Sequence, residues 1–239
     1  MVKPGWYIGM SESAIRERVV DEARKLIGIR EGSAEHKAII DAYNTRLSKL
    51  PRGYKVSYTD AWCAVTMSYI GIVLMISHVI LPECSCGKMI ELYRQQGRWE
   101  ERDDYVPSPG DLVMYDWDAK PGECTGAPDH VGMVEKVEGK TITVIEGNFD
   151  NQVKLRPICV EYINTRGFCL PDYGSLVQRF TDVEPDAWYA SDIARAAELG
   201  IVEGTGGGKF EPERAVTRAE CAAIAVRTYE KILQAIKGE

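Results

Sequence analysis

The chain has 239 residues, of which 29 are Lys or Arg and 36 are Asp or Glu, so its formal net charge is −7. Hydrophobic residues make up 45% of the sequence and charged residues 27%, a balance typical of soluble globular proteins. This composition argues against extensive disorder, and the negative charge argues against a basic surface for nucleic acid. The length favours one large domain followed by a smaller one.

The cysteines and the first residues of the chain bear on its cellular compartment. The sequence has 7 cysteines, an odd number without a repeated spacing, which favours reduced thiols over a disulfide framework. Residues 1–13 lack the apolar stretch of a secretory signal. We therefore expect a protein that is made in the cytoplasm without a signal peptide, and that another route must release if it acts outside the cell.

Three stretches in the first half of the chain are expected to be helical. Ser11 or Ser13 can cap the first, whose apolar residues recur at spacings of three and four until Gly28 ends it. A second helix is expected after Ser33, and a short one over residues 89–95.

Residues 61–82 contain no charged side chain, which meets the length criterion for a membrane span. Polar residues interrupt this run, and no basic cluster flanks it to fix a topology. We therefore expect a long, buried core helix and no membrane span. A membrane-associated protein that uses the run as an anchor is the alternative.

After Pro107 the hydrophobic period changes from helical to alternating. Strands are expected over residues 111–116, 131–137 and 141–145, which are rich in Val, Ile and Thr. Residues 138–140 would form a three-residue turn between the last two strands. Helices followed by an antiparallel sheet imply an α+β domain.

A change in composition divides the chain. We expect the α+β domain to span residues 1–174, a linker to span 175–179, and a small all-α unit to span 180–239. The small unit is rich in Ala, Glu and Gly, and a glycine-rich loop at 204–208 separates its two helical stretches.

Cys63 and His130 are the candidates for nucleophilic chemistry. Cys63 lies where a loop enters the apolar run, and the positive end of a helix dipole there favours the thiolate. The alternative is a small buried hydrophobic side chain, which describes most free cysteines. His130 is the best general base, because His36 lies on a charged helix and His78 lies within the apolar run. A histidine satisfied within the structure is the alternative for His130.

The strand after His130 and its partner supply groups that could orient the imidazole. With a three-residue turn, Gly132 faces Glu146 and His130 faces Asn148, so that Glu146 is the diagonal neighbour of His130. A carboxylate or amide there can hold the ring so that its other nitrogen reaches a thiol. A one-residue slip would turn these groups away, leaving Glu146 as a solvated strand end and Asn148 as a turn residue.

Four motifs together resemble the CHAP family, the cysteine, histidine-dependent amidohydrolases/peptidases. They are Asp60-Ala61-Trp62-Cys63-Ala64, Pro107-x-Pro109-Gly110-Asp111-Leu112-Val113, Asp129-His130-Val131-Gly132-Met133-Val134 and Val144-Ile145-Glu146-Gly147-Asn148. They occur in the family's order within residues 10–172. The resemblance implies a papain-like fold and cleavage of peptidoglycan by an amidase or endopeptidase, as in phage and prophage endolysins. It makes Cys63 the nucleophile, His130 the base and Glu146 the orienting carboxylate, with Asn148 assisting.

No metal or cofactor is expected. Some CHAP domains carry an acidic calcium loop before the nucleophile, but residues 47–59 contain no carboxylate. Asp116-x-Asp118 begins like an EF-hand loop, but Lys120 and Pro121 occupy its third-ligand and glycine positions. The cysteines, Cys84-Ser85-Cys86 included, lack the usual Cys-x-x-Cys spacing of a zinc site.

The C-terminal segment resembles one S-layer homology motif over roughly residues 180–233. The matching residues are Phe180-Thr181-Asp182-Val183, Trp188-Tyr189, Ala197-Glu198-Leu199-Gly200-Ile201-Val202, Gly204, Gly208-x-Phe210-x-Pro212 and Val216-Thr217-Arg218-Ala219-Glu220. The resemblance implies binding of a secondary cell-wall polymer through Trp188 and Arg218, whose planar guanidinium suits a carboxylate. The alternative is a helical pair with solvated charges.

One helix pair of this size cannot bury both faces of its apolar residues. It must therefore dock onto the first domain or associate with other copies of the chain, and we favour a homo-oligomer. The leading hypothesis is thus a two-domain peptidoglycan hydrolase that acts on the bacterial wall after release from the cytoplasm. The alternative is a non-catalytic wall-binding protein with a papain-like scaffold.

Overall fold

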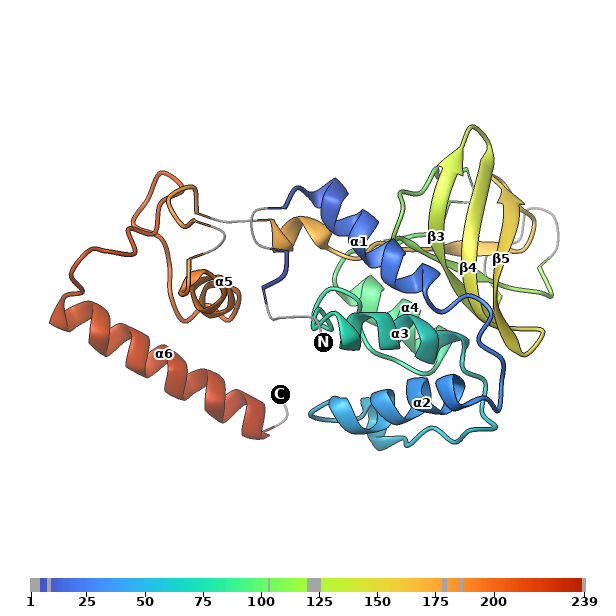
Figure 1. Cartoon of the computed structure of the whole chain (residues 1–239), viewed down its shortest axis with the longest axis horizontal. Coiled ribbons are helices and arrows are strands. Elements are labelled where there is room, and N and C mark those ends of the chain that lie inside the picture. The colour runs from blue at the N-terminus through green and yellow to red at the C-terminus, as the bar shows by residue number, and fades with distance from the viewer. Residues whose placement is uncertain are drawn as a thin grey trace. The chain divides into compact units, whose positions relative to one another are not determined.

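A computed structural model describes residues 5–7, 10–102, 104–119, 126–177, 180–184 and 187–237 (Figure 1). The chain divides into two compact units. The first spans residues 13–175, and the second contains the described residues from 176 onward together with those between 3 and 12. The functional boundaries expected at 174 and 180 stay a prediction.

The first unit combines helices with a single antiparallel sheet. Its helices are α1 (Glu12–Arg24), α2 (Ala34–Arg46), α3 (Cys63–Val73) and α4 (Cys86–Gln95), with short 3-10 turns at Pro51–Gly53 and Tyr173–Leu176. Its strands are β1 (Trp99–Glu100), β2 (Leu112–Tyr115), β3 (His130–Glu138), β4 (Thr141–Phe149), β5 (Gln152–Cys159) and β6 (Thr165–Cys169). In the described residues these form a six-stranded sheet in the order β1-β6-β2-β3-β4-β5. The predicted α+β class is confirmed.

Helix α3 lies at the centre of the unit. It packs against α2 on one side and against β3 and β4 on the other, as Figure 1 shows. Helix α1 lies beside β3, where Arg24 Nε donates a hydrogen bond of 2.9 Å to Glu135 Oε1. Helix α2 begins as the sequence predicts, because the Ser33 hydroxyl accepts a hydrogen bond of 3.1 Å from the backbone N–H of His36.

The long core helix predicted over residues 61–82 is wrong in length. Helix α3 has 11 residues, Cys63–Val73, and the chain then turns back through Met75 in a left-handed conformation (φ 57°). The returning chain passes so close that a Cβ on Gly71 would lie 2.8 Å from the carbonyl oxygen of Ile80. The apolar residues are therefore divided between a short helix and the segment packed on it. None of the helices in the described part of the chain has the length and apolar character to cross a membrane.

The β3–β4 hairpin has the predicted register at one end and not at the other. Gly132 pairs with Glu146, as expected. Glu138, however, pairs with Thr141, so the connecting loop has two residues and the predicted three-residue turn is wrong. An irregularity at Glu135, between Val134 and Lys136, shifts the register back. The bulge thus compensates for the shorter turn before the strands reach the candidate site.

Strand β5 has no counterpart in the sequence-based prediction. It contains Pro157, which lacks a backbone donor and argues against a central strand. The structure places β5 at the edge of the sheet, where it pairs with β4 alone among the strands. An edge strand tolerates proline, so Pro157 is compatible with β5 at this position.

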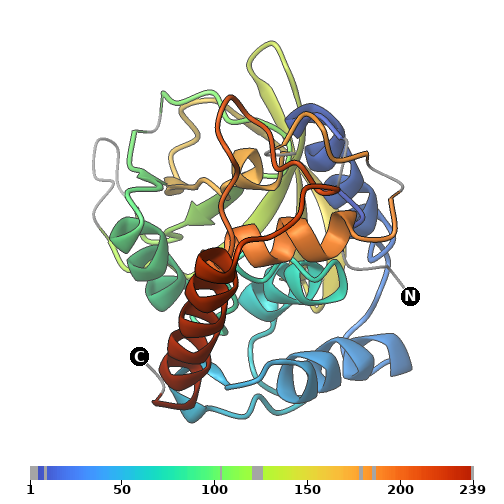
Figure 2. The ribbon, with the colours of Figure 1, turned by 90° about the vertical axis from the view of Figure 1, so that its left-hand side faces the viewer.

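The second unit contains α5 (Ala190–Glu198) and α6 (Arg218–Lys237), connected by a long loop (Figure 2). Phe180, Val183 and the buried face of α5 form its core. The Asp182 carboxylate fixes the loop by accepting hydrogen bonds of 2.8 Å from the backbone N–H groups of Phe210 and Glu211.

Helix α6 covers little of this core. Its apolar side chains Val226, Tyr229 and Ile232 are more than half exposed, at 56%, 62% and 52%. A groove of about 720 Å³ lies between the first turns of α6 and the preceding loop. The unit therefore presents an apolar surface that its own described residues leave open.

Candidate active site

Cys63 is the first residue of α3, and its side chain is buried, with 4% exposure. The hydrogen bond with the Cys86 thiol lowers the pKa of Cys63 well below its ordinary value, although burial opposes this. A hydrogen bond and the charge of His130 lower the pKa further, as does the backbone N–H of Ala64. These groups favour a thiolate, and the helix start adds the positive end of its dipole.

His130 opens β3 and is buried among aromatic rings. The ring centroids of Tyr115, Trp117 and Phe149 lie 5.8, 5.6 and 6.0 Å from that of the imidazole. Burial alone would lower the pKa of His130, but its interactions with Cys63 and Glu146 outweigh it and raise the pKa to about 9. The imidazole is therefore protonated at neutral pH when the thiol is ionised.

Glu146 on β4 lies behind the imidazole. Its Oε2 atom is 3.4 Å from His130 Nε2, within the distance of an ion pair. The contact lacks the alignment of a hydrogen bond. Because Nε2 faces Glu146, Nδ1 is the ring nitrogen that remains for Cys63. Gly132 makes this approach possible, since a Cβ there would lie 2.7 Å from Glu146 Cγ.

Arg156 on β5 holds the other side of the Glu146 carboxylate. Its Nε atom donates to both carboxylate oxygens at 3.0 Å, and its second terminal nitrogen donates to Oε1 at 2.8 Å. Burial raises the pKa of Glu146, but the ion pair with His130 and the hydrogen bonds from Arg156 prevail and keep the pKa below its ordinary value. The carboxylate therefore stays charged although it is fully buried.

Aromatic rings surround the Arg156 guanidinium. The ring centroids of Tyr115, Trp117, Phe149 and Tyr162 lie 4.6, 5.2, 5.0 and 5.5 Å from its central carbon. Ring faces attract a cation and restrict its side chain to one arrangement. Three of the same rings border His130, so one aromatic set supports both neighbours of Glu146.

Asn148 does not pair with His130 in the sheet. The β3–β4 ladder ends at Gly132 and Glu146, and Asn148 adopts a left-handed conformation (φ 57°) where β4 becomes irregular. Its Oδ1 atom is buried and has no hydrogen-bond partner among the described residues. The assisting role of Asn148 stays a prediction, while the Glu146 carboxylate lies beside the imidazole.

Gly147, next to Asn148, explains how the two halves of the site meet. A Cβ on Gly147 would lie 2.2 Å from Thr66 Oγ1 of α3. The absence of a side chain therefore lets α3, which carries Cys63, pack directly against β4, which carries Glu146.

Two residues of this cluster were not predicted from the sequence. Arg156 pairs with Val144 across β4–β5 and so lies diagonal to Glu146. Recognition of β5 as a strand would have revealed it, but no strand was predicted over those residues. Cys86 begins α4, and its Sγ atom is 3.8 Å from Cys63 Sγ. No spacing or motif in the sequence indicated that contact.

His36 differs from its expected setting on a charged helix. The side chain is fully buried, with its ring centroid 4.6 Å from that of Trp62. Its Nδ1 atom accepts a hydrogen bond of 3.1 Å from the backbone N–H of Gly32. His36 therefore packs beneath the residue that precedes Cys63. Among the residues that the structure describes, no group of three or more His, Cys, Asp or Glu side chains could hold a metal ion; Cys124, Lys120 and Pro121 lie outside them.

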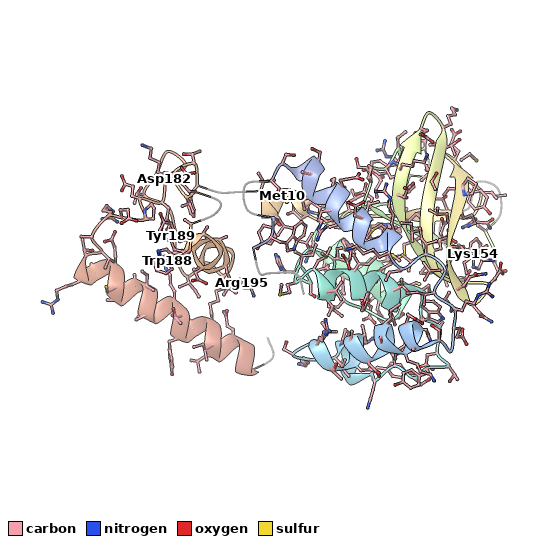
Figure 3. All side chains as sticks on the ribbon, viewed as in Figure 1. Met10, Lys154, Asp182, Trp188, Tyr189 and Arg195 are labelled. Carbon is pink, nitrogen blue, oxygen red and sulfur yellow. The ribbon has the colours of Figure 1, made fainter. Side chains whose placement is uncertain are left out.

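The two candidate wall-binding residues lie on the second unit. Trp188 precedes α5 and is 86% exposed, with Tyr189 packed edge-on at 5.4 Å (Figure 3). Arg218 is the first residue of α6 and is also exposed. Thr217 caps α6, because its hydroxyl accepts from the backbone N–H of Glu220 at 3.2 Å. The Glu220 carboxylate in turn accepts a hydrogen bond of 2.7 Å from the Thr217 backbone N–H.

Protein-family models match two segments of the chain. The first, a CHAP domain, matches residues 51–148, and the second, an S-layer homology domain, matches residues 179–222. The chain carries a CHAP domain followed by an S-layer homology domain. The CHAP match contains Cys63, His130 and Glu146, and the second match contains Trp188 and Arg218. No solved structure matches the chain.

Curated proteins resemble short parts of the chain. The Surface-layer 125 kDa protein of Lysinibacillus sphaericus is 45% identical over 51 residues, which is 21% of this chain and 4% of that protein. The Cell surface protein of Thermoanaerobacter kivui is 42% identical over 62 residues, or 25% of this chain and 8% of that protein. Exoglucanase XynX of Acetivibrio thermocellus is 42% identical over 53 residues, which is 22% of this chain and 5% of that protein. The matches thus span less than a tenth of these relatives.

These comparisons correct the predicted localisation. The expectation of a product made in the cytoplasm without a signal peptide is wrong, because an S-layer homology domain indicates a secreted, cell-surface protein. Two of the relatives are themselves named as surface proteins. Free cysteines argue against a disulfide framework, but they do not decide the compartment. A CHAP domain indicates a peptidoglycan hydrolase, amidase or endopeptidase, and an S-layer homology domain indicates binding to the cell wall.

Proposed function

We propose that the chain is a cysteine-dependent peptidoglycan hydrolase held at the bacterial cell surface. One observation carries the proposal: a buried thiol at a helix start interacts with an imidazole whose Nε2 lies 3.4 Å from a buried carboxylate. A thiolate, a proton carrier and a group that orients it are the parts that thiol hydrolysis of an amide requires.

The reaction proceeds through an acyl-enzyme. The Cys63 thiolate attacks the carbonyl carbon of an amide, and the backbone N–H groups at the start of α3 stabilise the oxyanion. His130 donates its proton to the leaving amine as the C–N bond breaks, which leaves a thioester on Cys63. Water then attacks the thioester and gives a proton to His130, and the C–S bond breaks to release a carboxylic acid and restore the thiolate.

Glu146 and Arg156 act on the proton carrier. The Glu146 carboxylate faces Nε2 and stabilises the positive charge on the His130 ring. Arg156 fixes the direction of the carboxylate and keeps it ionised. In this arrangement Glu146 and Arg156 are positioning residues, while Cys63 and His130 touch the reacting atoms.

The second unit would attach the enzyme to its substrate. Trp188 and Arg218 are the proposed contacts with a secondary wall polymer, through a ring face and a planar cation respectively. We further propose that α6 associates with other copies of the chain, because Val226, Tyr229 and Ile232 are exposed on it. Light scattering tests this association, and a monomeric full-length protein at micromolar concentration would exclude it.

An endolysin that lyses cells for phage release was expected from the family resemblance. The surface-protein relatives instead favour a bacterial enzyme that cleaves the wall to which it is attached. Mass spectrometry of digested peptidoglycan would identify the bond, since new amino termini name the amide that was cut.

The nucleophile is tested by substitution of Cys63. We expect Cys63→Ala and Cys63→Ser to reduce the clearing of wall suspensions by about 10³-fold or more. Cys84→Ser is the matched control, because Cys84 lies near the same helix start as Cys86 but its sulfur contacts Arg52 at 3.3 Å. A Cys63 variant within about tenfold of wild type would end the assignment. A wild-type protein that binds walls without cleaving them would favour the non-catalytic alternative.

A further inference from the structure

A second thiol lies against the proposed nucleophile. Cys86 is the first residue of α4 and is buried, with 7% exposure. Its Sγ atom is 3.8 Å from Cys63 Sγ, although the two residues are 23 positions apart in the sequence. Cys86 supports the Cys63 thiolate by its hydrogen bond, but it takes part in none of the hydrolytic steps proposed above.

This distance brings the two sulfur atoms close to bonding range. A disulfide bond is about 2.05 Å long, so the sulfurs must approach by less than about 2 Å. Each cysteine begins its own helix, and a side-chain rotation at either helix start moves its sulfur without unwinding the helix. The environment of Cys63 also favours the thiolate, which is the form that reacts with peroxides.

The other described cysteines do not compete for Cys63. Cys84 is directed to Arg52, whose terminal nitrogen lies 3.3 Å from its sulfur. Cys169 is buried in β6, and Cys159 is exposed on the edge strand β5. Cys221 belongs to the second unit. Within the described part of the chain, Cys86 is the cysteine whose sulfur contacts that of Cys63.

We propose that Cys63 and Cys86 form a reversible disulfide when a peroxide oxidises the site, and that this bond switches off the hydrolase. The thiolate of Cys63 attacks hydrogen peroxide, the O–O bond breaks, and with one proton the products are Cys63 sulfenic acid and water. The Cys86 thiol then attacks the sulfenic sulfur, its proton leaves with the hydroxyl as a second water, and the S–S bond forms. Peroxide gains the two electrons that the two thiols lose.

The disulfide would serve two purposes at a cell surface. It removes the nucleophile, so hydrolysis stops while the wall is under oxidative stress. It also prevents further oxidation of Cys63 to the sulfinic and sulfonic acids, which are irreversible states. A small-molecule thiol restores the enzyme by thiol–disulfide exchange, returning two electrons. The switch, but not the bond itself, rests on the proposed function of Cys63.

The test treats the reduced full-length protein with hydrogen peroxide. The thiols that remain free are then blocked by alkylation. Trypsin cannot separate the two residues, because no Lys or Arg lies between Cys63 and Cys86. A protease that cleaves after Glu83 places Cys63 on one peptide and Cys86 on the next. We expect mass spectrometry to find these peptides joined, both in the wild type and in Cys84→Ser. The latter excludes Cys84 as the partner. Alkylated Cys86 beside oxidised Cys63 in the wild type would overturn the proposal.

Recovery of activity provides the second readout, expressed relative to each protein before treatment. Peroxide should lower wall hydrolysis by the wild type and by Cys84→Ser about tenfold or more, and dithiothreitol should restore both to within about twofold. Cys86→Ser should stay inactive after dithiothreitol, because without a resolving thiol the excess peroxide oxidises its Cys63 sulfenic acid further to the sulfinic and sulfonic acids, which dithiothreitol does not reduce. Equal recovery of Cys86→Ser and wild type would refute the switch. Cys86→Ala serves instead if circular dichroism shows that the serine variant is unfolded.

The peptide analysis is independent of hydrolysis, so the two proposals can fail separately. A disulfide that forms in a protein without hydrolytic activity would refute the proposed function and the switch, but not the bond. Active protein whose Cys63 and Cys86 never join would refute the bond and leave the proposed function intact.

Discussion

Replacing Arg156 by Met would leave the buried Glu146 carboxylate without its strongest partner. Met keeps an unbranched apolar side chain of similar reach, so the change removes charge and hydrogen bonds more than volume. Arg156 now donates three hydrogen bonds of 2.8–3.0 Å to a carboxylate that is fully buried. Breaking one side of a buried ion pair costs about 3–5 kcal/mol. We expect a loss of stability at the lower end of this range, because the Arg156 side chain is 16% exposed and His130 remains beside Glu146.

The loss of stability should depend on pH with a definite sign. In the wild type the pKa of Glu146 lies below its ordinary value, so the carboxylate contributes stability that is present above that value and lost as the pH falls. In Arg156→Met, burial is less opposed and raises the pKa of Glu146. The folded variant then binds a proton more readily than the unfolded chain does. Its destabilisation relative to wild type is therefore largest near neutral pH and shrinks in acid.

Urea unfolding measures this effect. The free energy of unfolding is compared for the wild type and Arg156→Met at about pH 7 and about pH 4.5. Combining the change with Glu146→Gln forms a double-mutant cycle, in which the two losses should add to more than the loss in the double variant. Arg102→Met is a matched control, because Arg102 pairs with Glu100 at 3.0 Å while its side chain is 65% exposed. Such surface pairs contribute about 0–1 kcal/mol. Equal losses at both pH values with additive effects would refute the buried-charge argument.

Two further predictions concern activity. Glu146→Gln should retain more activity than Glu146→Ala, because an amide can still hold the His130 ring; losing the proton-transfer assistance altogether should cost about 10²–10⁴ in rate. Equal, unimpaired rates in wall-clearing assays would show that another group orients the histidine. The profile of kcat/KM against pH should fall on the alkaline side near pH 9, because the pKa of His130 is raised to about 9 and a deprotonated ring cannot protonate the leaving amine. A fall near pH 6.5, the ordinary pKa of histidine, would contradict the ion pair.

The sequence predicted the placement of Cys63 and Glu146 better than it predicted the strands around them. Cys63 at a helix start and Glu146 opposite Gly132 both follow from local patterns. The second prediction held although its assumed turn was wrong, because the bulge at Glu135 restores the register. Asn148 shows the limit of such counting, since a left-handed residue at a strand irregularity leaves the ladder.

The hydrophobic periodicity of a sequence does not predict contacts between segments that are far apart in the chain. Arg156 could be placed only after β5 was recognised, and an edge strand with a proline resembles a loop in sequence. Cys86 meets Cys63 because the apolar chain reverses after Val73, and that reversal depends on Gly71 packing against Ile80. A run without charges carries no signal that fixes where a helix must end.

The edge strand β5 also has a consequence for an enzyme concentrated on a surface. The start of this edge is covered, because Gly28 N–H donates to the Val153 carbonyl at 2.9 Å and Val153 N–H donates to the Ile29 carbonyl at 2.8 Å. Beyond Val153, an open sheet edge offers backbone groups to which a neighbouring molecule can add a strand, and crowding increases that risk. Pro157 removes one donor from this edge, and Lys154, seen at the margin of the sheet in Figure 3, adds a charge that is held by Asp150 at 2.8 Å. Arg156, which supports Glu146, lies between them on the same strand. A strand added here would disturb the positioning of the imidazole, so resistance to aggregation and preservation of the catalytic geometry depend on the same short segment.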